Sequence, residues 1–155
     1  MKRIFIVLTM CLLVVSGCSS KGSSDVKDVK LTDLMSEIKD NADFDLPSFM
    51  DIDEATMESV YGLKAADVEQ FAIAFPMMNT QATEIIMIEA KEGKLDTVKK
   101  ALDTRMKTVE ETWATYLPAQ KELVDHRKTI EKGNYVIIVI AEKADDIAKT
   151  IEAKF

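Results

Sequence analysis

Glu84 and Arg105 are charged residues whose positions suit chemistry beyond that of a solvated surface. Arg105 lies beside Leu102, Met106 and Val109, apolar residues at helical spacing, so its side chain can reach back under the edge of a domain. Glu84 begins an apolar run and is the partner that we expect for it. The pair has two readings: an ion pair at the boundary of the core, or a contact for an anion or carboxylate on an exposed face.

Nucleophilic, metal and phosphate chemistry lack the residues that they require. His126 is the only histidine and lies in a charged run, and no serine after the leading segment lies in a G-x-S-x-G pattern. Zinc sites need clustered histidines and cysteines, whereas Cys11 and Cys18 both lie in the leading segment. Glycine-rich phosphate loops are absent from the sequence. We therefore expect no catalytic residue, no metal and no cofactor.

Two kinds of site that need only carboxylates are left open: a hydrolase site and a calcium site. A cell-envelope hydrolase could use Glu84, although Glu84 and Glu89 are five positions apart and point to opposite faces of an ideal strand. An acidic loop could hold calcium, yet its EF-hand registers lack the glycine and glutamate required at the sixth and twelfth positions. The aspartates of this loop are Asp43, Asp45, Asp51 and Asp53.

The leading segment has the order of a secretory signal. A positive start at residues 1–3 precedes an apolar run at residues 4–15, which is too short to span a bilayer. The following V-S-G-C, ending at Cys18, resembles the lipobox of bacterial lipoproteins. That resemblance implies cleavage after residue 17 and a diacylglyceryl group on the thiol of Cys18. We expect a signal peptide at residues 1–17, then the lipidated cysteine and a flexible tether at residues 18–30.

Charge and anchor together indicate where the protein is located. Membrane lipid attached through Cys18 would hold the chain at the extracytoplasmic face of the cell membrane, because two acyl chains anchor a protein stably. The net charge of −7 is opposite in sign to that of a nucleic-acid-binding surface. We expect no nucleic-acid partner.

The rest of the chain predicts one α+β domain over residues 31–155. Apolar spacing of three and four indicates helices, and period-two or unbroken apolar runs indicate strands. The expected order is α-α-β-β-α-α-β-α, with a small antiparallel or mixed sheet of about three strands and helices packed on it. The expected helices are residues 31–41, 53–61, 95–116, 119–128 and 147–155, and the expected strands are residues 70–75, 84–90 and 135–141.

Several residue runs, taken in order, are similar to a known family. They are N-T-Q-A-T-E-I at residues 79–85, Arg105, Y-L-P-A-Q at residues 116–120 and G-N-Y-V at residues 133–136. This pattern resembles domain-of-unknown-function family 4358, small lipoproteins typical of Gram-positive bacteria, over roughly residues 53–155. The family has no assigned activity, so the resemblance implies location and domain limits but no catalytic residue.

These observations predict a lipid-anchored extracytoplasmic lipoprotein that acts as a non-catalytic binding or accessory module. An envelope protein is the expected partner, and any small-molecule ligand is unknown. A carboxylate-based cell-envelope hydrolase and a small-ligand sensor are the alternatives.

Overall fold

A five-stranded sheet forms the middle layer of the computed structural model, which describes residues 27–155. Every neighbouring pair of strands is antiparallel, and the order across the sheet is β1-β2-β3-β5-β4. The strands are β1 (Phe49–Asp51), β2 (Val68–Pro76), β3 (Glu84–Ala90), β4 (Lys128–Lys132) and β5 (Tyr135–Ile140).

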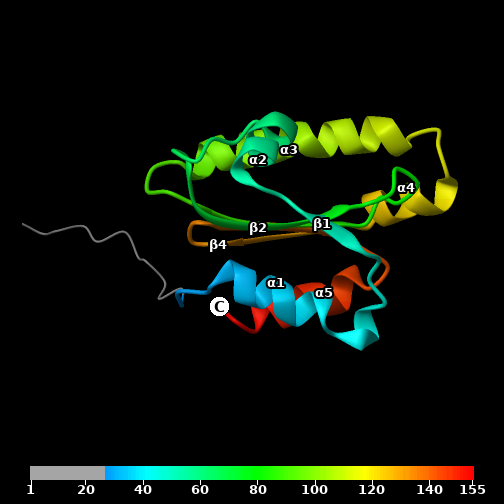
Figure 1. The fold of residues 1–155 in the computed structure, drawn as a ribbon, viewed down its shortest axis with the longest axis horizontal. Helices are drawn as coiled ribbons and strands as arrows, with labels where there is room; N and C mark the ends of the chain where they lie inside the picture. The colour runs from blue at the N-terminus through cyan, green and yellow to red at the C-terminus, as the bar shows by residue number, and fades with distance from the viewer. Residues whose placement is uncertain (1–26) are drawn as a thin grey trace, which may run out of the picture.

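Five α-helices form the outer two layers, as Figure 1 shows. Helices α1 and α5 cover one face of the sheet, and α2, α3 and α4 pack on the other. Their bounds are α1 (Leu31–Lys39), α2 (Glu54–Tyr61), α3 (Leu95–Trp113), α4 (Pro118–Asp125) and α5 (Ala144–Glu152), with a short 3-10 helix at Ala42–Phe44. No helix of residues 27–155 is long and apolar enough to cross a membrane.

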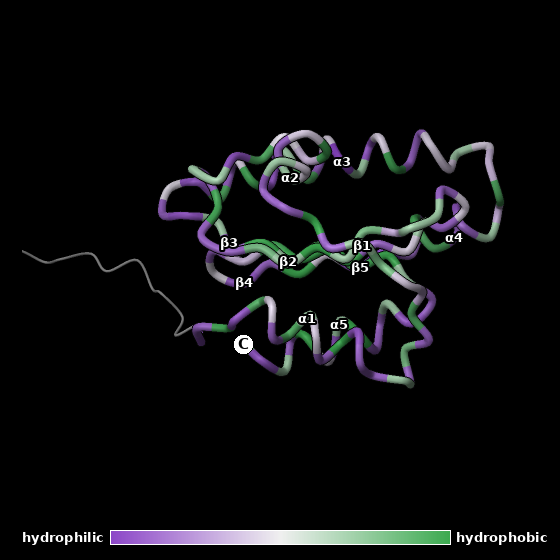
Figure 2. The backbone as a smooth tube through the Cα atoms, in the orientation of Figure 1, coloured by the Kyte–Doolittle hydropathy of each residue, from purple (hydrophilic) through white to green (hydrophobic). Residues whose placement is uncertain are grey.

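Two apolar cores, one on each face of the sheet, hold the layers together. In β2, Phe71 and Ile73 point toward α2 and α3 while Ala72 and Ala74 point toward α1, as the alternation of large and small side chains predicts. All six residues of β5 are buried, and β5 lies between β3 and β4. Figure 2 shows the apolar colour running along these central strands. The strand expected over residues 135–141 is therefore an inner strand that is covered on both faces.

The predicted strand count of three was wrong, because one edge strand is too short and the other too charged to show a strand pattern. Strand β4 (K-T-I-E-K) buries only Ile130, and the helix expected over residues 119–128 ends at Asp125. Strand β1 has three residues and no buried one. Short, charged edge strands prevent sheet-to-sheet association, and the same charges remove the hydrophobic signal that reveals a strand.

Helix ends follow local sequence signals more closely. Asp53 accepts the backbone N–H of Thr56 at 2.8 Å and so caps α2, while Gly62 ends that helix in the left-handed region with φ of 68°. Helix α3 buries an i, i+4 stripe as expected, but it ends at Trp113 rather than continuing to Tyr116.

The chain joins the domain at the end of the sheet where β2 and β5 begin. The backbone N–H of Val29 donates to the Tyr135 hydroxyl at 3.3 Å, and the N–H of Leu31 donates to Gln70 Oε1 at 2.8 Å. The predicted signal at residues 1–17, Cys18 and the tether as far as residue 26 lie outside the described residues.

Candidate functional site

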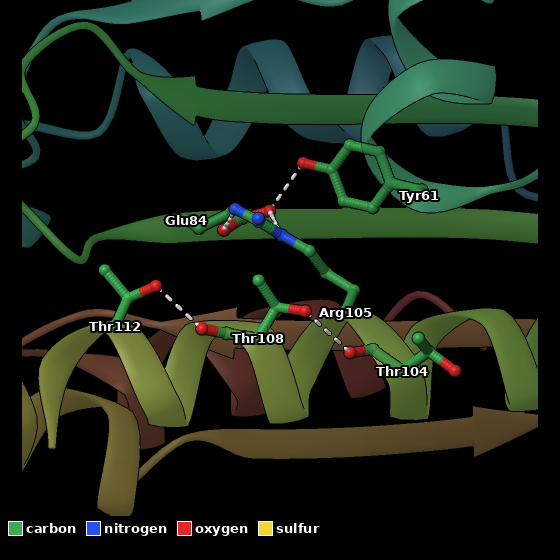
Figure 3. Close-up of polar contacts among 6 residues, drawn as sticks. All are labelled: Tyr61, Glu84, Thr104, Arg105, Thr108 and Thr112. Atoms are coloured by element: carbon green, nitrogen blue, oxygen red, sulfur yellow. Dashed lines mark hydrogen bonds and ion pairs between the residues drawn. The ribbon is translucent and has the colours of Figure 1, made fainter.

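Glu84 and Arg105 lie in direct contact beneath helix α3. Arg105 Nη2 is 2.8 Å from Glu84 Oε2, and its Nε is 3.3 Å from Oε1. The hydroxyl of Tyr61, at the end of α2, donates to Glu84 Oε1 at 2.5 Å (Figure 3). The structure therefore brings together both residues singled out in the sequence and adds a tyrosine, which its sequence position marks only as part of an apolar helix face.

The triad of Tyr61, Glu84 and Arg105 is largely buried, so its members strongly affect one another's pKa values. The Glu84 side chain is 2% exposed and that of Arg105 is 15% exposed. Burial, and then the neighbouring Glu84 carboxylate, raise the pKa of Tyr61 far above its ordinary value. Burial acts to lower the pKa of Arg105, but the hydrogen bond to Glu84 and its charge outweigh burial and raise that pKa. Tyr61 thus stays protonated, and the pair is charged.

Aromatic rings hold the guanidinium from both sides. The Arg105 Cζ atom is 5.4 Å from the ring centroid of Tyr61 and 5.4 Å from that of Phe75, within the range of cation–π attraction. Both oxygens of Glu84 already accept hydrogen bonds. These contacts hold the carboxylate and the guanidinium in one relative orientation.

One end of the guanidinium remains open. Arg105 Nη1 makes no hydrogen bond to another residue in 27–155, and no buried side-chain nitrogen or oxygen in that range lacks a partner. Nη1 therefore reaches the surface, where it can donate to a neighbouring molecule.

A groove of about 360 Å³ is lined in part by Arg105 and Glu84. We call it the Trp113 groove. Its apolar lining comes from β1, from the end of β2 and the segment after it, and from α3: Met50, Phe75, Met77, Met78, Val109 and Trp113. Its polar lining is Asn79, Gln81 and Thr112, and the charged residues that line it are Glu84 and Arg105.

Exposed apolar side chains are concentrated at this groove. Met77 and Met78 are each 58% exposed and Met50 is 44% exposed, and all three line it. The ring of Tyr116, itself half exposed, stacks on Trp113 with centroids 5.7 Å apart. A cluster of exposed methionines and aromatics is typical of an interaction surface.

Threonines line the helix beside the groove. The hydroxyls of Thr104, Thr108 and Thr112 each donate to the carbonyl four residues earlier in α3, at 2.9, 3.3 and 2.7 Å respectively. Figure 3 shows the bonds of Thr108 and Thr112. Because its donor is used within the helix, Thr112 offers the groove its methyl group and oxygen lone pairs.

The groove lies at the opposite end of the sheet from the point where the chain joins the domain. Glu84 pairs with Ile140, whereas Glu89, beside the segment at Val29, pairs with Tyr135. Five strand residues separate these ends by about 17 Å. Figure 1 shows the start of α1 at one end and the end of α3 at the other.

The other candidate residues do not assemble into a site. His126 is exposed, with its Nδ1 2.8 Å from the carbonyl of Glu122. Asp51 pairs with Lys39, and Asp53 caps α2. Residues 27–155 hold no group of three or more His, Cys, Asp or Glu that could bind a metal ion. Glu89 lies on the other face of the sheet from Glu84 and accepts from Gln70 Nε2 at 2.7 Å.

Comparison with known proteins gives one match. A family model described as "Domain of unknown function (DUF4358)" matches residues 42–141, which include all five strands, the triad and Trp113. The matched range, residues 42–141, begins and ends earlier in the chain than the range of roughly 53–155 that the resemblance predicts. No curated protein and no solved structure matches the chain.

Proposed function

The chain belongs to the family described as domain of unknown function DUF4358, and we propose that it is a lipid-anchored extracytoplasmic protein that works as a non-catalytic binding or accessory module. The Trp113 groove is its binding surface, and the observation that carries the proposal is the gathering of exposed apolar side chains there. Met77 and Met78 would be costly to leave in water without a use, since contiguous exposed apolar surface favours association. Trp, Arg and Met are residue types enriched at protein interfaces.

The chemistry of the triad also favours binding over catalysis. Both oxygens of Glu84 accept hydrogen bonds and the side chain is almost fully buried, so the carboxylate is poorly placed to take a proton from a substrate. Tyr61 keeps its proton because burial and Glu84 raise its pKa. The triad is therefore suited to holding Arg105 at the floor of a binding groove.

The anchor supplies the second half of the proposal. The V-S-G-C pattern ending at Cys18 supports lipid attachment. Holding a module on the membrane surface raises its effective concentration for a nearby envelope partner without adding any contact. The groove lies at the far end of the domain from Val29, which suits a module that presents its binding surface away from its anchor.

Site-directed photo-crosslinking in native membranes tests this function. The full chain is made with p-benzoylphenylalanine in place of Met78, and a matched control carries it in place of Glu92, an exposed residue at the other end of the sheet. We expect one dominant envelope protein attached at position 78 and not at position 92. Equal capture at both positions, or none at position 78, would contradict a binding role for the groove.

A small-ligand sensor is the second candidate, because about 360 Å³ lies at the lower limit of volumes that hold small molecules. A sensor predicts that some envelope metabolite raises the melting temperature of the full chain by binding the folded state alone. A binding module for proteins predicts no such shift with envelope metabolites that lack an apolar side chain joined to a peptide group.

A further inference from the structure

We infer that the Trp113 groove takes an uncharged apolar side chain, together with a backbone carbonyl group, from a protein segment of an extracytoplasmic partner. This inference rests on the proposed function and deepens it by naming the chemistry of the partner. Charge, hydrogen-bonding groups, wall flexibility and position in the molecule support it in turn.

Charge excludes ionic occupants. Glu84 and Arg105 line the groove as a closed ion pair, so its floor carries no net charge in a chain whose total charge is −7. An anion would meet the Glu84 carboxylate, and a cation would meet the Arg105 guanidinium. Burying an unpaired charge is costly, whereas an apolar side chain fills the space without that penalty.

The hydrogen-bonding groups of the groove match a peptide group. Arg105 lines the groove, and its Nη1 makes no hydrogen bond to another of the described residues. The side-chain amides of Asn79 and Gln81 also line the groove. Neutral donors and acceptors of this kind pair with backbone carbonyl and N–H groups without introducing a charge.

The flexible side chains that line the groove suit an apolar side chain of a partner better than a single rigid ligand. Met50, Met77 and Met78 are unbranched and can adjust to different apolar shapes, while Trp113 and Phe75 form firmer walls. The volume of about 360 Å³ suits one or two side chains. A partner anchored by a central apolar residue is the common arrangement at protein interfaces.

Position argues against the anchoring membrane as the occupant. Val29 contacts Tyr135 at one end of the sheet, and the groove lies by Glu84 at the other. A partner that approaches from the side away from the chain's attachment point reaches the groove most directly.

The test uses Trp113, the only tryptophan in the chain, as a fluorescence reporter. The full lipidated chain is reconstituted in phosphatidylcholine vesicles and titrated with N-acetyl-leucine amide, N-acetyl-leucine and N-acetyl-lysine amide. We expect a saturable change with the leucine amide in the millimolar range, as suits so small a probe. The carboxylate and the lysine probes should bind at least tenfold more weakly. Equal or tighter binding of either charged probe, or no saturable change, overturns the inference.

Two matched variants localise the effect. Met78→Lys places a charge in the groove, and Leu117→Lys makes the same replacement at an exposed apolar residue outside its lining. We expect at least a tenfold loss of binding in the first and less than a twofold change in the second. Equal loss in both overturns the assignment to the groove.

Cross-linking at position 78 distinguishes failure of the inferred side-chain chemistry from failure of the proposed binding function. If the leucine amide fails to bind while position 78 still captures one envelope protein, the side-chain chemistry is wrong and the proposed function stands. Capture of a second copy of this chain at position 78 overturns the partner assignment.

Discussion

Glu84 shows how one buried carboxylate can join several elements around one site. It joins β3 to α3 through Arg105 and to α2 through Tyr61. The carboxylate satisfies the guanidinium, and the guanidinium compensates the burial of the carboxylate. Removing either charge leaves the other buried and unpaired, so the pair acts as a unit.

Replacing Glu84 with glutamine should destabilise the fold by about 3–5 kcal/mol, because the guanidinium of Arg105 loses its counter-charge in a largely buried position. Urea denaturation of the full chain measures the change. The matched control is Glu110→Gln, which breaks the more exposed pair with Arg127 and should cost less than about 1 kcal/mol. A Glu84→Gln protein of unchanged stability that loses a hydrolytic activity would instead establish the hydrolase alternative.

Tyr61 gives the triad a dependence on alkaline pH. The folded-state pKa of Tyr61 is raised by burial and by Glu84, so the unfolded chain releases this proton first, above about pH 10. The stability that depends on the protonated hydroxyl is complete below that pH and is lost as the pH rises. Tyr61→Phe removes the donor, should cost about 1–3 kcal/mol at neutral pH, and cannot ionise.

The stability gap between wild type and Tyr61→Phe should therefore shrink as the pH is raised through the tyrosine range. Denaturation at a series of pH values measures this gap. Tyr116→Phe, at a half-exposed position, is the control and should behave as wild type throughout. A constant gap would show that Tyr61 ionises equally easily in both states.

At the scale of elements, the end of α2 positions the triad. Tyr61 is the last residue of the helix, and Gly62 follows with φ of 68°, a conformation that L side chains adopt at a cost. A Cβ atom added at Gly62 would meet nothing within 4 Å, so the cost of a side chain there is conformational and not steric.

Gly62→Ala should therefore destabilise the chain by about 1–2 kcal/mol, measured by thermal or urea unfolding. Gly62→Asn should recover much of this loss, since asparagine tolerates the left-handed region better than alanine. Equal losses for both variants would mean that the helix end reorganises rather than keeping its left-handed residue.

The strands differ in how well the residues of each strand predict that it is a strand. Strand β5 is apolar at all six positions, and β2 alternates large and small side chains, so both can be predicted from the residues alone. Strand β4 is held by pairing with β5, by the burial of Ile130 and by surface ion pairs of Lys128 and Glu131. Its place in the sheet depends on a partner strand that follows it in the chain.

At the scale of the whole molecule, the Trp113 groove and the start of the described chain lie at opposite ends of the sheet. The first contact of the described chain with the domain is at Val29, and the Trp113 groove lies beyond the other end of the sheet. A domain arranged in this way can be attached near Val29 and still present the groove to a partner at its other end. This arrangement is compatible with the proposed lipid attachment at Cys18.

Cys18→Ala in the full chain should leave the melting temperature unchanged and release the protein from the membrane fraction. Because effective concentration at the membrane is lost, capture of the envelope partner at position 78 should fall by at least tenfold. Fractionation, thermal melting and cross-linking measure the three outcomes. A soluble Cys18→Ala protein that captures its partner as well as the wild type would remove the need for an anchor.

The sequence by itself determined the α+β class, the helix stripes, the caps of α2 and the hairpin of β2 with β3, because each depends on residues within a few positions of one another. It also marked Glu84 and Arg105 by their place beside apolar runs. Only the tertiary structure added Tyr61 to the pair, placed β4 and β1 at the edges, and gathered Met50, Met78 and Trp113 around one groove. These features arise where segments distant in the sequence meet, and no local pattern of side chains encodes such a meeting.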